Sequence, residues 1–182
     1  MKTVIAYESK DQQSVLKLVK AIDERFSVTL IDVTETRSAN LSEYELIGFA
    51  SEIEDDGFYR DIASFAANWM PRDKKIFFLY TAPTEKPDYC EELEGTAHFK
   101  NCEVVGKYGC MGQEGLSGFR LFGNKNKNHP NEEEIEGALK FFEEVSRQVP
   151  NNKSKKDDKK DKKPEDKNTE AKKDDKDKKD KK

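Results

Sequence analysis

The chain has 182 residues and a formal net charge of −4, and this length suffices for one domain with a hydrophobic core. The charge is unevenly distributed: residues 151–182 carry +5, with 15 lysines, 10 acidic residues and one apolar residue, an alanine, so residues 1–150 carry −9. We interpret residues 1–150 as a folded acidic domain and residues 151–182 as a disordered Lys/Asp-rich tail, because such a segment buries too little apolar surface to fold.

This composition excludes several classes of protein. An acidic domain lacks the basic face that nucleic acids require, and for the tail we expect only weak electrostatic contacts. No apolar run approaches the ~20 residues of a membrane span, and no signal peptide is recognisable, so we expect a cytoplasmic protein without membrane insertion. The three cysteines and two histidines show no metal-ligand spacing, which argues against a disulfide framework and a metal site.

Apolar patterning divides the domain into alternating strands and helices. Five short runs, rich in β-branched and aromatic residues, predict strands at 4–7, 28–33, 44–50, 75–80 and 103–110. Apolar residues at helical spacing predict helices at about 15–26, 58–70, 89–99 and from 131 onward. In the second of these helices, Phe65 and Trp69 are interpreted as core residues from their spacing.

The last helix carries a start signal of its own. Asn131 precedes Glu134 by three residues, a spacing typical of a capping box. His129 lies in the preceding His-Pro-Asn turn, and we interpret it as structural rather than catalytic.

Alternating strands and helices predict an α/β fold with a three-layer, doubly wound, five-stranded parallel sheet, and the strand order 2-1-3-4-5 fits best. Ligands in such sheets bind beyond the carboxyl ends of the strands, where the winding changes direction. Here those ends are the loops 9–14, 51–57 and 81–84. The first loop leads into a helix N-terminus, a position that favours a phosphate.

The sequence resembles the flavodoxin family in four stretches: YELIGFAS at 44–51, VVGKYGCMG at 104–112, GFRLFG at 118–123 and KNHPNEEEI at 127–135. The resemblance implies a flavodoxin-like domain that binds FMN non-covalently and passes electrons between redox partner proteins. It implies an electron carrier more than an enzyme with a substrate of its own, and we assign no catalytic residue. On this resemblance, three loops hold the cofactor, and the matching positions are Ser9, Lys10, Asp11, Gln12, Gln13, Ser14, Ser51, Glu52, Ile53, Thr81 and Ala82.

Two loops depart from the family pattern. In the first, Asp11 places a carboxylate near the expected phosphate, and Gln12 replaces a glycine that lets the backbone approach closely. The second loop is acidic, and residues 52–56 are interpreted as a docking face for a basic redox partner. Two hypotheses follow: an FMN-binding electron-transfer protein, or a flavodoxin-like fold that has lost FMN and acts as a binding module.

Overall fold

Five parallel strands form a sheet with the order β2-β1-β3-β5-β6 in a computed structural model that describes residues 1–10, 13–84, 88–112 and 128–149. The strands are β1 (Thr3–Glu8), β2 (Thr29–Asp32), β3 (Leu46–Glu54), β5 (Lys75–Ala82) and β6 (Glu103–Met111). The predicted parallel order is confirmed, and residues 150–182, which hold the predicted tail, lie outside the described part.

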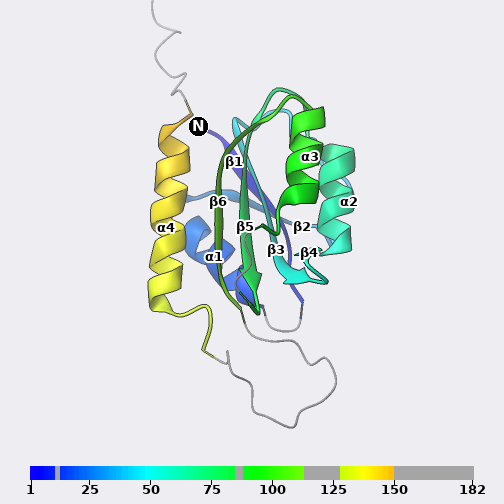
Figure 1. Cartoon of the computed structure of the whole chain (residues 1–182). Coiled ribbons are helices and arrows are strands. Elements are labelled where there is room, and N and C mark those ends of the chain that lie inside the picture. Colours follow the sequence, from blue (N-terminus) through cyan, green and yellow to red (C-terminus); the bar gives the residue numbers. More distant parts are fainter. Residues whose placement is uncertain (11–12, 85–87, 113–127, 150–182) are drawn as a thin grey trace, which may run out of the picture. The chain divides into compact units, whose positions relative to one another are not determined.

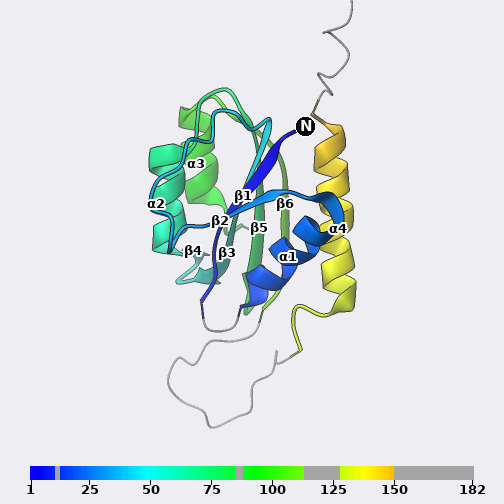
Figure 2. The same ribbon diagram turned by 180° about the vertical axis from the view of Figure 1, so that it is seen from behind.

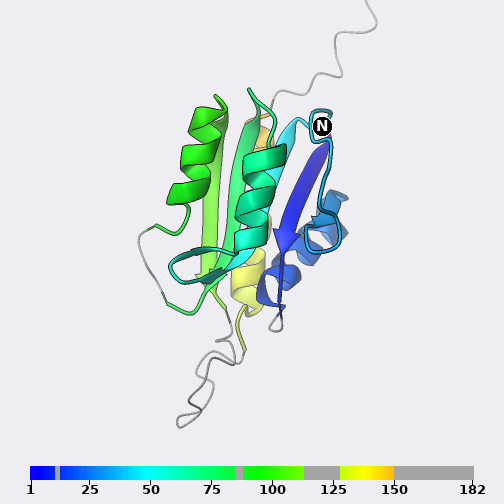
Figure 3. The same ribbon diagram turned by 90° about the vertical axis from the view of Figure 1, so that its right-hand side faces the viewer.

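Helices cover both faces of this sheet (Figures 1 and 3). On one face lie α1 (Ser14–Phe26) and α4 (Glu132–Arg147), which pack against a core that includes Ile5, Phe77 and Phe142. On the other lie α2 (Arg60–Trp69) and α3 (Glu91–Phe99), over Phe49 and Phe78. Figure 2 shows α1 and α4 side by side from behind. The central strands are apolar because both of their faces are covered.

The third strand differs from the prediction. It continues from Leu46 to Glu54, so the expected loop 51–57 is mostly strand, and it turns back into a short antiparallel strand, β4 (Gly57–Phe58). Asp55 and Asp56 form the turn with φ angles of 48° and 70°. Positive φ at both central residues is typical of a type I′ hairpin turn, and aspartate is among the few residues that tolerate this conformation.

The core assignment of Trp69 is wrong, although that of Phe65 is confirmed. Phe65 is 4% exposed. Trp69, the last residue of α2, is 40% exposed. Helical spacing places both on one stripe, but the stripe leaves the sheet where the helix ends at Met70 and Pro71.

Two glycines let aromatic rings lie across neighbouring strands. Gly48 of β3 is the register partner of Phe77 in β5, and a Cβ at this glycine would lie 2.4 Å from the Phe77 Cζ. Gly109 of β6 has the same relation to Tyr80, at 2.2 Å. Real Cβ atoms do not come so close, so the rings fill the volume that side chains at these glycines would need.

The start of α4 is tied to the end of β6. The predicted capping box is confirmed, because the Asn131 side chain accepts from the Glu134 amide and the Glu134 carboxylate accepts from the Asn131 amide. The same carboxylate accepts from the amide of Met111 at 3.2 Å and contacts the His129 Nδ1 at 2.8 Å. His129 therefore has the structural position that its motif indicates.

Candidate functional site

The carboxyl ends of β1, β3 and β5 meet at one edge of the sheet, as the fold requires. The register places Glu8 beside Ser51, and Glu52 beside Thr81. This edge contains every described residue that the sequence assigned to a cofactor site. Asp11 and Gln12, the remaining two, lie outside the described residues.

The side chain of Glu52 points into the loop between β1 and α1. Its carboxylate accepts hydrogen bonds from the Ser9 hydroxyl at 2.7 Å, the Lys10 amide at 3.0 Å and the Val15 amide at 3.1 Å. Val15 is the second residue of α1, so its amide is one that the helix itself leaves without a partner. Glu52 is 5% exposed, and charge-assisted hydrogen bonds together with the helix dipole stabilise its negative charge there.

Strand alternation explains why Glu52 reaches this position. Leu46 and Ala50 of β3 face α1, and Glu52 follows them with the period of two residues that places it on the same face. Ser51 and Ile53 face the opposite side, toward α2 and α3. The hydroxyl of Ser51 accepts there from the Tyr59 amide at 3.1 Å, which holds the start of α2 against β3.

Glu8 makes the reciprocal contact. It ends β1, faces the opposite side from Glu52, and accepts at 2.9 Å from the amide of Ile62, the third residue of α2. The N-cap residues of α1 and α2, Gln13 and Tyr59, make no side-chain cap of their own. Each helix start is therefore served by a carboxylate from the strand that precedes the other helix.

Burial raises the pKa of the Glu8 carboxyl above its ordinary value, and the Ile62 amide and Lys10 oppose this rise only in part. The ammonium of Lys10 lies 3.9 Å from the Glu8 carboxylate and 3.6 Å from that of Glu54. It also lies 3.6 Å from the centroid of the Tyr59 ring, a cation–π distance. Lys10 thus links the first loop to the β3–β4 hairpin.

The raised pKa of Glu8 has a consequence for stability. The folded chain keeps this proton to a higher pH than the unfolded chain, so stability is lost as pH rises through the raised pKa. We expect urea denaturation between about pH 4 and pH 7 to show wild type losing stability relative to Glu8→Gln as pH rises. The matched change Glu144→Gln, at an exposed carboxylate of the last helix, should leave the pH profile as in wild type; equal profiles for all three proteins would contradict the prediction.

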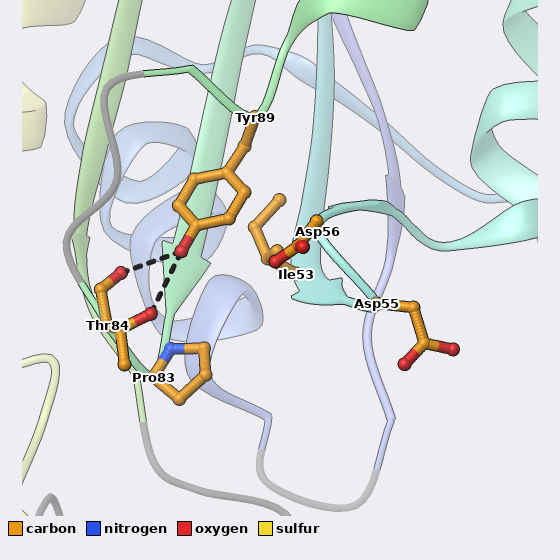
Figure 4. Close-up of a pocket in the computed structure, with 6 residues that line it drawn as sticks. All are labelled: Ile53, Asp55, Asp56, Pro83, Thr84 and Tyr89. Carbon is orange, nitrogen blue, oxygen red and sulfur yellow. Dashed lines mark hydrogen bonds between the residues drawn. The ribbon is translucent and has the colours of Figure 1, made fainter.

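Beside the hairpin turn, the structure forms an open recess of about 420 Å³ (Figure 4). Its lining residues are Ile53, Asp55, Asp56, Pro83, Thr84 and Tyr89. The Tyr89 hydroxyl is held by the side chain and the carbonyl of Thr84, at 3.1 and 3.0 Å, so its ring forms a fixed wall opposite Ile53. An adjoining hollow adds the exposed carboxylates of Asp88, Glu91 and Glu92. We call these two hollows the acidic recess.

The structure separates the predicted site residues into two groups. Lys10, Glu52, Ser14 and Thr81 lie around the start of α1, whereas Ser51, Ile53 and Ala82 belong to the α2 and α3 side. Sequence reasoning missed Glu8 and Tyr89. The only signal for Glu8 was an acidic residue directly after an apolar strand, and nothing in the sequence indicated that Tyr89 forms a wall.

Among the described residues, the position expected for the FMN phosphate already holds an anion of the chain itself. Three donors at this position, the Ser9 hydroxyl and the Lys10 and Val15 amides, bind the Glu52 carboxylate. A second anion at ~4 Å from this carboxylate would be opposed by about 4 kcal/mol at an effective dielectric constant near 20. A side chain of the chain itself therefore uses the site that the resemblance assigns to the cofactor.

Two further classes of site receive no support from the structure. Within the described residues there is no group of three or more His, Cys, Asp or Glu side chains arranged to hold a metal ion. Burial raises the pKa of Cys90 and Cys110 to about 12, so both thiols stay protonated and unreactive at neutral pH. In the described part of the chain, no helix has the length and apolar character needed to cross a bilayer.

Comparison with known proteins identifies a relative and a fold. The chain is 31% identical over 147 residues to the uncharacterized protein MJ0298 of Methanocaldococcus jannaschii, covering 80% of this chain and 98% of that protein. No family model matches.

Solved structures resemble the chain at lower identity. Flavodoxin 2 of Bacillus cereus is 18% identical with a TM-score of 0.55, over 82% of this chain and all of that one. A WrbA-like flavodoxin of Agrobacterium tumefaciens is 15% identical with a TM-score of 0.56, over 82% and 99%. Rubredoxin oxygen:oxidoreductase of Desulfovibrio gigas is 13% identical with a TM-score of 0.56, over 81% of this chain and 35% of that one. These likenesses show the fold.

Proposed function

Because the chain belongs to the family of MJ0298 and has the flavodoxin-like fold, we propose that it uses this fold as a protein-binding module that docks a basic partner in the acidic recess. The observation that carries the proposal is the composition of the recess. Pro83 and the nearly buried Ile53 and Tyr89 line the hollow, and exposed carboxylates surround them. A hollow bordered by exposed charges of one sign suits a partner of the opposite charge.

Charge complementarity identifies the chemistry of the partner. Asp55, Asp56, Glu91 and Glu92 are exposed at the recess, and residues 1–150 as a whole carry −9. A segment with arginine or lysine fits these groups, because the stem of such a side chain is apolar while its head is cationic. The hairpin that carries the two aspartates is closed by the pairing of Ile53 with Phe58, so the charges stand on a defined turn. Electrostatic complementarity of this kind favours fast, salt-dependent association.

We expect the double change Asp55→Asn and Asp56→Asn to weaken binding of a peptide of alternating arginine and leucine by about fivefold, since each exposed charge pair contributes little by itself. Asparagine tolerates positive φ as aspartate does, so the turn is kept. Isothermal titration calorimetry of the full chain at low and high salt measures the loss. The matched control is Glu24→Gln with Glu144→Gln, which removes two exposed charges from α1 and α4. Equal peptide affinity in the two double variants would contradict the proposal.

A second candidate is the FMN-binding electron carrier. The resemblance to solved flavodoxins favours it, because it extends over 82% of this chain and the full length of the Bacillus cereus protein. It requires Glu52 to leave the first loop, since its carboxylate holds the donors that a phosphate needs. The two candidates differ in a simple observable: the carrier would show the visible absorbance of bound flavin after purification, and the binding module would be colourless.

A further inference from the structure

The environment of Glu52 has the chemistry of an anion site. Its carboxylate accepts one hydrogen bond from the Ser9 hydroxyl, after β1, and another from the Val15 amide, at the start of α1. The amide of Lys10 completes the set at 3.0 Å. Three donors that converge on one buried negative group are the arrangement that proteins use for phosphate or sulfate at a helix start.

The carboxylate comes from far along the chain. Helices are usually capped by the residue that directly precedes them, yet Gln13 makes no side-chain cap, and the anion is delivered by a strand 37 residues beyond Val15. Ser9, Lys10 and Val15 therefore build the anion position, and a side chain of β3 fills it.

A buried hydroxyl without a partner lies near the same helix start. Thr81 is 1% exposed, lies beside Glu52 in the sheet register, and shares its face, since Leu79 two residues earlier packs on the α1 side. Its Oγ1 has no hydrogen-bond partner in the described part of the chain. A Cβ built on Gly112 would lie 3.0 Å from this oxygen and 3.5 Å from the Ser14 Cβ, so the hydroxyl stands next to the first residue of α1.

We propose that Glu52 is a built-in substitute for a bound phosphate: its carboxylate occupies three donors and so keeps them from an external anion. Removing the carboxylate frees the Ser9, Lys10 and Val15 donors, and the site then takes inorganic phosphate or the phosphate of FMN. This inference is independent of whether the acidic recess binds a partner, because Asp55 and Asp56 make none of these contacts.

The test compares Glu52→Ala with wild type in the full chain. We expect the variant to bind inorganic phosphate and FMN at least about tenfold more tightly than wild type, because a hydrogen bond to a charged group contributes strongly. Phosphate binding is measured by the rise in unfolding temperature against sodium chloride of equal ionic strength, and FMN binding by quenching of flavin fluorescence. No gain of phosphate affinity in Glu52→Ala, or wild-type binding of FMN as tight as that of the variant, would overturn the inference.

Two controls separate the carboxylate's position from its charge. Glu144→Ala removes the same charge from an exposed residue of α4, and it should bind phosphate as wild type does. Riboflavin has the ring of FMN without the phosphate, so Glu52→Ala should gain no affinity for it. An equal gain in Glu144→Ala, or an equal gain for riboflavin and FMN, would show that the loop donors are not the cause.

A second measurement applies if Glu52→Ala does not fold. The isosteric Glu52→Gln keeps the volume and removes the charge, so the amide protons of Lys10 and Val15 should move upfield in its NMR spectrum relative to wild type. Adding phosphate to wild type should leave both resonances in place. Unchanged resonances in Glu52→Gln, or a wild-type shift on adding phosphate, would contradict an anion position held by Glu52.

Discussion

Replacing Gly48 by alanine is expected to destabilise the domain by about 2 kcal/mol, because the new Cβ overlaps a packed ring. The clash involves three atoms of the Phe77 ring, at 2.4 to 2.9 Å, and Phe77 is fully buried between β3, β5 and α4. The ring cannot swing aside, since it packs edge-on against Phe141 and Phe142 with centroids 6.1 and 5.7 Å away. Chemical denaturation measures the loss as a shift of the midpoint at an unchanged slope.

The cause can be isolated by a double-mutant cycle. Phe77→Leu removes the ring atoms that the Cβ meets, so Gly48→Ala should cost much less in its presence than in wild type. Gly95→Ala is the matched control: a Cβ there meets no atom within 4 Å, and alanine inside α3 should stabilise by about 0.5–1 kcal/mol. Additive costs for Gly48→Ala and Phe77→Leu would show that the ring is not the reason.

Replacing Glu134 by alanine is expected to cost about 1–3 kcal/mol, the second of the two large effects. One carboxylate accepts from the Asn131 amide at 2.7 Å and the Met111 amide at 3.2 Å, and it contacts His129 at 2.8 Å. Its loss leaves the Asn131 and Met111 amides without this partner and removes one tie between the start of α4 and the end of β6, while the Tyr108 hydroxyl still donates to the Glu134 carbonyl.

Glu133 provides the comparison for this change. It lies in the same first turn of α4 and is exposed, so Glu133→Ala should lose only the dipole contribution of about 0.3–1 kcal/mol. Thermal and urea unfolding of both variants at neutral pH decide the matter. If the two variants lose the same stability, the contacts of the Glu134 carboxylate contribute nothing beyond its charge.

Local patterns in the sequence were sufficient for the sheet and most of its helices. The capping pair Asn131 and Glu134 was readable because both partners lie within four residues of each other. The strand order followed from alternation and handedness. The β3–β4 hairpin was missed because aspartates at a turn resemble a solvated acidic loop, and only the backbone angles of Asp55 and Asp56 reveal the pairing.

The site was less accessible to sequence reasoning than the fold. Its expected location followed from the sheet topology. The role of Glu52, however, depends on a contact between β3 and the start of α1, which are 37 residues apart in the sequence. Pattern reasoning ranks a glutamate at a strand end as exposed, because carboxylates are rarely buried without partners. The partners are backbone amides and one hydroxyl. Backbone amides occur in every loop, so no residue pattern indicates that they will bind a carboxylate.

The exchange of carboxylates between β1–α1 and β3–α2 affects how this part of the domain opens. Glu8 completes the start of α2, and Glu52 completes the start of α1, so neither strand–helix unit is fully hydrogen-bonded alone. If one unit unfolds locally, the carboxylate of the other loses its hydrogen-bond donors, and the free energy of those charge-assisted bonds is lost with them. Opening of either unit is therefore coupled to opening of both, and this edge of the sheet behaves as one cooperative unit rather than as two adjoining ones.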